Sequence, residues 1–163
     1  MIEIKAPDKT DFQRFARIFL AGSISGATGL GSMAENWQEK VSKELIDEKV
    51  ILYNPRRDDW DSSWVQDPTP GTYFHEQVSW ELDSIEKSDL VVFYFDPETQ
   101  SPITLLELGC VIGSGKRFVV CCPDGYFRKG NVVITCRRAG VFVCNNFEQF
   151  MNDIRKNLIE LQK

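Results

Sequence analysis

Short apolar runs alternate with stretches of helical periodicity along most of the chain. The apolar runs predict five buried strands, at residues 17–22, 50–55, 89–95, 116–122 and 140–145. Between them, apolar residues recur three to five positions apart, which predicts a helix containing Trp37, Val41, Leu45 and Ile46 and further helices at 73–87, 101–115 and 147–161. Strands that alternate with helices favour right-handed crossovers. We therefore expect an α/β fold with a doubly wound, five-stranded parallel sheet and helices on both faces.

Three segments fall outside this alternation. Residues 1–16 are interpreted as an irregular N-terminal arm, 54–72 as a polar loop with three prolines and two tryptophans, and 123–131 as a basic loop. Because no repeat or linker interrupts the chain, we expect residues 1–163 to form one domain. Long loops on a compact domain usually build a site, and ligands of such sheets bind beyond the carboxyl ends of the strands.

The charge balance restricts the class of ligand. A formal net charge of −5 argues against a nucleic-acid polymer or an anionic membrane as the partner. An anionic small molecule would therefore need a dedicated site. No apolar run is long enough to span a bilayer, and the first residues, MIEIKAPDKTDFQRF, lack the apolar stretch of a signal peptide.

The cysteines and the single histidine do not form a metal-binding pattern. Five cysteines are never spaced as C-x-x-C, so neither structural zinc nor a disulfide framework is expected. Cys121 and Cys122 lie in an apolar run and are interpreted as buried thiols. We expect a cytoplasmic protein, in a reducing compartment, that uses no metal or organic cofactor.

Glu107 is the most informative single residue, because it stands among leucines on the predicted helix at 101–115. A buried, unpaired carboxylate is costly and has a raised pKa. Glu107 either lies on an exposed stripe of that helix or faces a ligand as a nucleophile or general base. Glu81 and Asp83 on the preceding helix are either solvated acids, or Glu81 faces Glu107 and handles a proton for it.

Two polar segments could contact a ligand. The loop AGSISGATG offers backbone N–H groups and the hydroxyls of Ser23 and Ser25 as an anion cradle, although it matches no nucleotide-binding fingerprint. The segment NPRRDDWD is either a solvated turn or a set of planar groups that bind the edges of an aromatic ring. Its charged residues are Arg56, Arg57, Asp58, Asp59 and Asp61, with Trp60 and Trp64 beside them.

Taken together, IFLAGSISG, NPRRDDWD, QVSWELDSIEKSDLVVFYF, SPITLLELG and YFRKGNV resemble the nucleoside 2-deoxyribosyltransferase superfamily, and its nucleoside 2-deoxyribosyltransferase-like branch most. The resemblance covers Arg17 to Phe147. It implies a flavodoxin-like fold and cleavage of the N-glycosidic bond of nucleosides or nucleotides. It also implies that Glu107 is the nucleophile and that Glu81 protonates or holds the base. Asn131 would be contributed by a neighbouring subunit, which implies a homo-oligomer, a dimer or larger, with shared sites.

The same resemblance assigns substrate contacts. Related deoxynucleoside monophosphate N-glycosidases hold a 5′-phosphate with a G-S-I segment, here Gly22, Ser23 and Ile24, and with a serine at the position of Ser101, where the transferases have an aspartate. A nucleotide is therefore favoured over a free nucleoside. Asp58 and Asp61 are expected to recognise the base, and Arg57 and Trp80 are expected to bind the substrate.

One departure from the family opens alternatives. Where the family often has a tyrosine that orients the glutamate, this chain has Phe19, so Glu107 loses a hydrogen bond. The first alternative is a nucleotide hydrolase without base exchange, which Ser101 favours. The second is a nucleotide-binding module that has lost catalysis, which Phe19 favours and the pair of Glu81 and Glu107 opposes.

Overall fold

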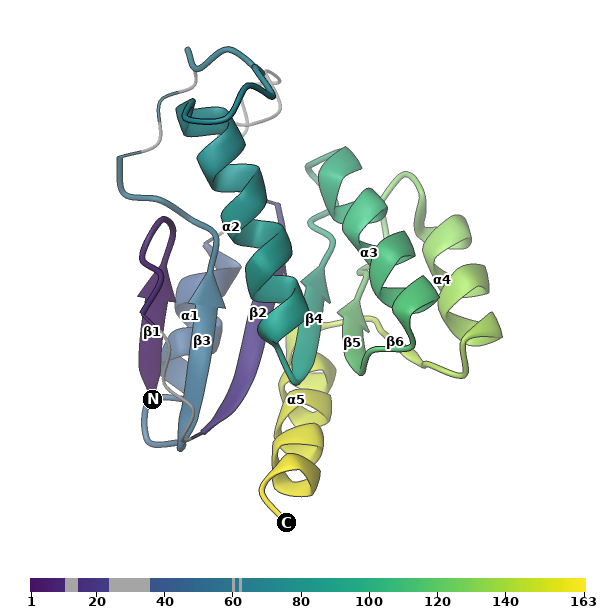
Figure 1. Cartoon of the computed structure of the whole chain (residues 1–163). Coiled ribbons are helices and arrows are strands. Elements are labelled where there is room, and N and C mark those ends of the chain that lie inside the picture. The colour runs from purple at the N-terminus through teal and green to yellow at the C-terminus, as the bar shows by residue number, and fades with distance from the viewer. Residues whose placement is uncertain (11–14, 24–35, 60, 62) are drawn as a thin grey trace.

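A computed structural model describes residues 1–10, 15–23, 36–59, 61 and 63–163 (Figure 1). In this part of the chain, six strands form one sheet in the order β1-β3-β2-β4-β5-β6, and every neighbouring pair is parallel. The strands are β1 (Ile2–Lys5), β2 (Ala16–Gly22), β3 (Val50–Asn54), β4 (Leu90–Tyr94), β5 (Phe118–Cys121) and β6 (Val143–Cys144). The helices are α1 (Trp37–Glu44), α2 (Tyr73–Lys87), α3 (Pro102–Ser114), α4 (Lys129–Arg138) and α5 (Phe147–Leu161).

The helices form a layer on each side of the sheet. Figure 1 shows α2, α3 and α4 in front of the strands and α1 and α5 behind them. Successive residues of a strand point to opposite faces, and accordingly Phe19 packs in the core under α2 and α3 whereas Ile18 and Leu20 pack in the core under α1 and α5. The strand order from β3 to β6 is the flavodoxin-like order, with β1 added at one edge. The expected doubly wound, parallel α/β fold is confirmed.

The expected irregular arm at residues 1–16 is wrong, because its beginning is a strand. Residues Ile2–Lys5 pair with β3 in the register Ile2 to Ile51, which makes six strands instead of the five expected. Ile4 is buried, and the Glu3 carboxylate accepts hydrogen bonds from Ser42 and Asn54. Two isoleucines alternating with charged residues give too short an apolar signal to predict an edge strand.

The expected loop at 123–131 is also wrong at its end. A turn is followed by α4, which fills the crossover from β5 to β6, and the strand expected at 140–145 is only Val143–Cys144. Val132 and Cys136 are the buried residues of α4. The β-branched run VVIT has little helical preference by itself, so packing on the sheet stabilises the helix.

Burial determines the protonation state of two cysteines. All five cysteines are free. Burial raises the pKa of Cys121 and Cys122 to about 12, so both thiols are neutral at physiological pH.

Among the helices in the described residues, none combines the length and the apolar character that a membrane span requires.

Candidate active site

The sheet has its switch point between β2 and β4, where the connections leave in opposite directions. Ligands of such sheets bind beyond the carboxyl ends of these two strands. Gly22 ends β2 there, and a Cβ on it would lie 2.6 Å from Cζ2 of Trp37 and 2.7 Å from the carbonyl oxygen of Tyr94. Only glycine fits this close approach of β2 to its neighbours.

A cluster of buried hydroxyls occupies this switch point. Ser23 Oγ lies 2.5 Å from Thr99 Oγ1, and Thr99 Oγ1 lies 2.7 Å from Ser101 Oγ. Ser23 and Ser101 also share a hydrogen bond. The structure thus brings together the two serines that the sequence assigned to a phosphate, and it adds Thr99, which sequence reasoning missed. Ile24, the third residue of that assignment, lies outside the described residues.

The hydroxyl cluster lies at the N-terminus of α3. Ser101 is the N-cap residue, with a left-handed φ of 45°, and its side chain does not cap the helix. Its hydroxyl is directed to Ser23 and Thr99 instead. The first N–H groups of a helix have no partner within the helix and attract negative charge. Hydroxyl donors beside such a terminus form an arrangement suited to an anion.

Glu81 and Glu107 form a carboxylate pair on the α2 and α3 side of the sheet. Both side chains are partly buried. Burial raises the pKa of Glu81 to about 7, and burial together with the charge of Glu81 raises the pKa of Glu107 to about 8. Two carboxylates that interact in this way titrate as a pair, so the pair loses its protons in coupled steps near neutral pH.

The surroundings of Glu107 and Glu81 differ. Among the described residues, no hydrogen bond to the Glu107 carboxylate offsets its raised pKa. Phe19 is fully buried, 6.3 Å from Trp80 between ring centroids, and has no hydroxyl to offer. Glu81, in contrast, accepts a hydrogen bond from Gln77, which partly opposes the effect of burial.

Arg57 connects the 54–72 loop to the first turn of α2. Its Nε and Nη2 donate to the Asp59 carboxylate at 2.8 and 3.0 Å, and its Nη1 donates to Glu76 at 3.0 Å. Its guanidinium lies 5.0 Å from the ring centroid of Trp64, and that ring stacks on Tyr73. The Arg57 side chain is only 2% exposed. These contacts make Arg57 a structural anchor of the loop, and its expected contact with the substrate stays a prediction.

The other residues expected at the site are distributed around it. Asp58 is exposed and forms an ion pair with Lys5 at 2.7 Å, and Asp61 accepts a hydrogen bond from the backbone N–H of Ser63. The buried Trp80 donates its indole N–H to the carbonyl of Asp8 at 2.6 Å. Asn131 is exposed on the first turn of α4. Trp60 lies outside the described residues. Within the part of the chain that the structure describes, no hydrogen bond or ion pair links these side chains to the carboxylate pair or to the hydroxyl cluster.

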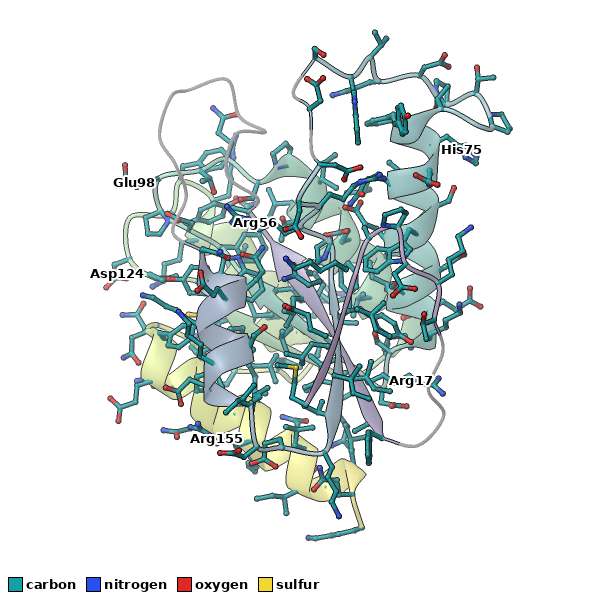
Figure 2. The ribbon with its side chains drawn as sticks, turned by 90° about the vertical axis from the view of Figure 1, so that its left-hand side faces the viewer. Arg17, Arg56, His75, Glu98, Asp124 and Arg155 are labelled. Carbon is teal, nitrogen blue, oxygen red and sulfur yellow. The ribbon has the colours of Figure 1, made fainter. Side chains whose placement is uncertain are left out.

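A stick view places the loops relative to the sheet. Figure 2 shows Arg56 and Glu98 toward the end of the molecule at which β2 and β4 finish, whereas Arg17 and Arg155 lie toward the opposite end. Arg56 belongs to the 54–72 loop, and Glu98 belongs to the turn between β4 and α3. Both loops therefore border the switch point. Among the described residues, no three metal-ligating side chains cluster.

Comparison with known proteins identifies the family. The family model described as nucleoside 2-deoxyribosyltransferase like matches residues 16–126. The match runs from the start of β2 past α3, so it includes the hydroxyl cluster and both carboxylates, and Asn131 lies beyond its end. No curated protein matches the chain. Since the matched segment makes up more than half of the sequence, the chain belongs to the nucleoside 2-deoxyribosyltransferase-like family.

Proposed function

We propose that this protein cleaves the N-glycosidic bond of a deoxynucleoside or nucleoside, preferably as its 5′-monophosphate, with Glu107 as the nucleophile. The observation that carries the proposal is the partly buried pair of Glu81 and Glu107, whose pKa values are raised to about 7 and about 8. Two coupled carboxyl groups that titrate near neutral pH can keep one proton while the other group is ionised, which is what an acid and a nucleophile need in order to act together.

The reaction would run in two steps. The ionised carboxylate of Glu107 attacks the anomeric carbon while the bond to the base breaks, and the bonding electron pair leaves with the base nitrogen. In the substrate-free protein the higher pKa of Glu107, about 8 against about 7 for Glu81, leaves the proton of the pair mainly on Glu107. In the reaction this proton is held by Glu81 instead, and it passes from there to the departing base. Water or a second base then displaces Glu107 from the sugar, and the proton that this nucleophile loses returns to Glu81. The cationic transition state favours the ionised form of Glu107.

The hydroxyl cluster supports a nucleotide as the substrate. Ser23, Thr99 and Ser101 are neutral donors beside the N-terminus of α3, and a 5′-phosphate is the anionic part of a nucleotide. A free nucleoside would leave this cluster without a charged partner. The overall negative charge of the chain is compatible with this, because the anion is held locally by neutral groups.

Ser101 also favours hydrolysis over base exchange, since the transferases that this chain resembles have an aspartate at the position of Ser101. A deoxynucleoside 5′-monophosphate is incubated with and without a second free base, and the products are separated. Free base and sugar phosphate alone would indicate a hydrolase. An exchanged nucleotide would indicate a transferase.

A binding module without catalysis is the second candidate, and Phe19 is the observation that favours it, because no hydroxyl from that position reaches Glu107. Calorimetric titration with a deoxynucleoside 5′-monophosphate separates the two. Tight binding without turnover would support the binding module. Release of free base at an enzymatic rate would exclude it.

We also propose a cytoplasmic homo-oligomer in which Asn131 completes the site of a neighbouring subunit. Asn131 is exposed, and Ile103, Leu106 and Ile134 are exposed apolar residues on α3 and α4. Five free cysteines fit a reducing compartment. Mixing inactive Glu107→Gln subunits with inactive Asn131→Ala subunits should restore part of the activity if sites are shared, and should restore none if each subunit is complete.

Substitution of Glu107 tests the proposed function. Glu107→Gln keeps the size of the side chain and removes the nucleophile, so release of base should fall by about 1,000-fold or more. The matched control is Glu148→Gln on the exposed first turn of α5, which should leave the rate unchanged. Undiminished activity in a folded Glu107→Gln protein would refute the assignment.

A further inference from the structure

Gln77 connects Glu81 to the loop that follows β3. It lies on α2 one turn before Glu81, and only 3% of it is exposed. Its Nε2 lies 2.9 Å from the carbonyl oxygen of Pro55 and 2.8 Å from Oε1 of Glu81. Within the described residues, its Oε1 is buried without a hydrogen-bond partner. Gln77 therefore donates both of its amide hydrogens, one to each of these two acceptors.

The carbonyl of Pro55 settles which way the amide points. A carbonyl oxygen can only accept, so the group of Gln77 that faces it must be the NH₂ and not the oxygen. The second hydrogen of that NH₂ is donated to Glu81 Oε1. Glu81 Oε1 is consequently an acceptor in this contact, whether or not the carboxyl group is protonated.

We propose that Gln77 is a positioning residue for the reaction: it holds Glu81 by Oε1 and thereby confines the proton that Glu81 gives or takes to Oε2. This inference rests on the proposed function, in which Glu81 protonates the departing base. A carboxylic acid that could rotate freely would present its proton in several directions. A fixed Oε1 leaves one oxygen to carry it, and a fixed donor direction makes proton transfer efficient.

The same amide makes Glu81 dependent on the 54–72 loop. Pro55 belongs to the start of that loop, and two residues later Arg57 bonds to Glu76, the residue before Gln77. The loop and the α2 helix therefore meet at Gln77 and Glu76. The charged groups on the elements that meet here are Glu107 from α3, which interacts with Glu81, and Arg57, Asp59 and Glu76, which form ion pairs at the junction of the loop with α2.

Replacement of Gln77 by methionine tests the positioning role, because methionine keeps the length of the side chain and removes both donors. The kcat for a deoxynucleoside 5′-monophosphate should fall about tenfold, with KM changed less than about twofold. The limb of the pH profile that reports the coupled pair of Glu81 and Glu107 should move up by as much as about one pH unit, because a hydrogen bond that lowers the pKa of Glu81 is lost. Gln149→Met, at an exposed glutamine of α5, is the control and should change neither.

A second measurement needs no turnover. The Glu81 carboxyl is titrated by carbon NMR in the substrate-free wild type and in Gln77→Met, and its pKa should rise in the variant. If Gln77→Met does not fold, Gln77→Leu, which also lacks both donors, is expected to give the same rise. An unchanged titration and an unchanged kcat would overturn the positioning role while leaving the proposed function intact. Activity in Glu107→Gln would overturn the function instead, whatever Gln77 does to Glu81.

Discussion

Ser23 and Ser101 are 78 residues apart in the chain, yet their hydroxyls share a buried hydrogen bond beyond the ends of β2 and β4. The contact exists because β2 and β4 are neighbours in the sheet, paired from Ile18 with Leu90 to Gly22 with Tyr94. Each serine follows one of these strands. The chain thus places two neutral donors at the point where an α/β sheet of this order binds its ligand.

Ser101→Asp should shift the substrate preference from the 5′-monophosphate to the free nucleoside. A carboxylate beside Ser23 would repel a phosphate, and we expect KM for the monophosphate to rise at least about tenfold relative to that for the nucleoside. Aspartate tolerates the left-handed backbone that Ser101 adopts, so the fold should persist. Ser101→Ala separates the loss of the hydroxyl from the added charge. Steady-state kinetics with both substrates would contradict the phosphate site if the KM ratio did not change.

Gly22→Ala should destabilise the fold by about 1–3 kcal/mol, because the new methyl group would meet the Trp37 ring and the Tyr94 carbonyl at less than van der Waals distance. The matched control is Gly113→Ala in α3, where a Cβ meets nothing within 4 Å. That change should stabilise by about 0.5–1 kcal/mol, the difference in helix preference between the two residues. Urea unfolding of both variants measures the contrast. Equal stabilities would show that β2 does not approach Trp37 closely.

The alternation of strands and helices was predictable from the sequence, since each central strand is a continuous apolar run between turn residues. The edges of the sheet were not. Residues Ile2–Lys5 become a strand only because β3 offers them a partner, and α4 is stabilised by the burial of Val132 and Cys136. The topology itself requires α4, because parallel strands need a crossover of about a dozen residues, usually helical.

The candidate site was predictable where local sequence determines the chemistry. Glu107 was identifiable as a carboxylate among leucines, but α3 is apolar around most of its surface, so periodicity could not decide whether Glu107 faces solvent or Glu81. The contact between Gln77 and Glu81 was predictable from the sequence, because residues four apart on a helix are neighbours. The ion pair of Arg57 with Glu76 was not, since it depends on how the 54–72 loop folds back on α2.

Arg57→Lys should loosen the 54–72 loop although it keeps the charge. Lysine cannot reproduce the two parallel hydrogen bonds to Asp59 together with the bond to Glu76, so we expect a loss of about 1–3 kcal/mol and faster proteolytic cleavage within the loop. The control is Arg117→Lys, whose ion pair with Glu160 is exposed and should contribute less than about 1 kcal/mol. Similar unfolding midpoints and cleavage rates for the two variants would contradict the anchoring role.

The stability of the protein should fall as the pH rises from about 5 to about 8. The folded-state pKa values of Glu81 and Glu107 are raised from the ordinary 4.5 to about 7 and about 8, so in this window the folded chain binds more protons than the unfolded chain. Stability falls with pH wherever that holds, by at most about 1.4 kcal/mol per pH unit for each group. The lowered pKa values of Asp59 and Asp124, below the ordinary 3.8, act at lower pH and do not mask the effect. Thermal unfolding across this range, without a 5′-monophosphate so that ligand affinity does not enter, measures the effect. The pH dependence should be flatter for Glu107→Gln than for the wild type, because glutamine cannot ionise. An identical slope in the two proteins would mean that Glu107 titrates as an ordinary surface carboxylate.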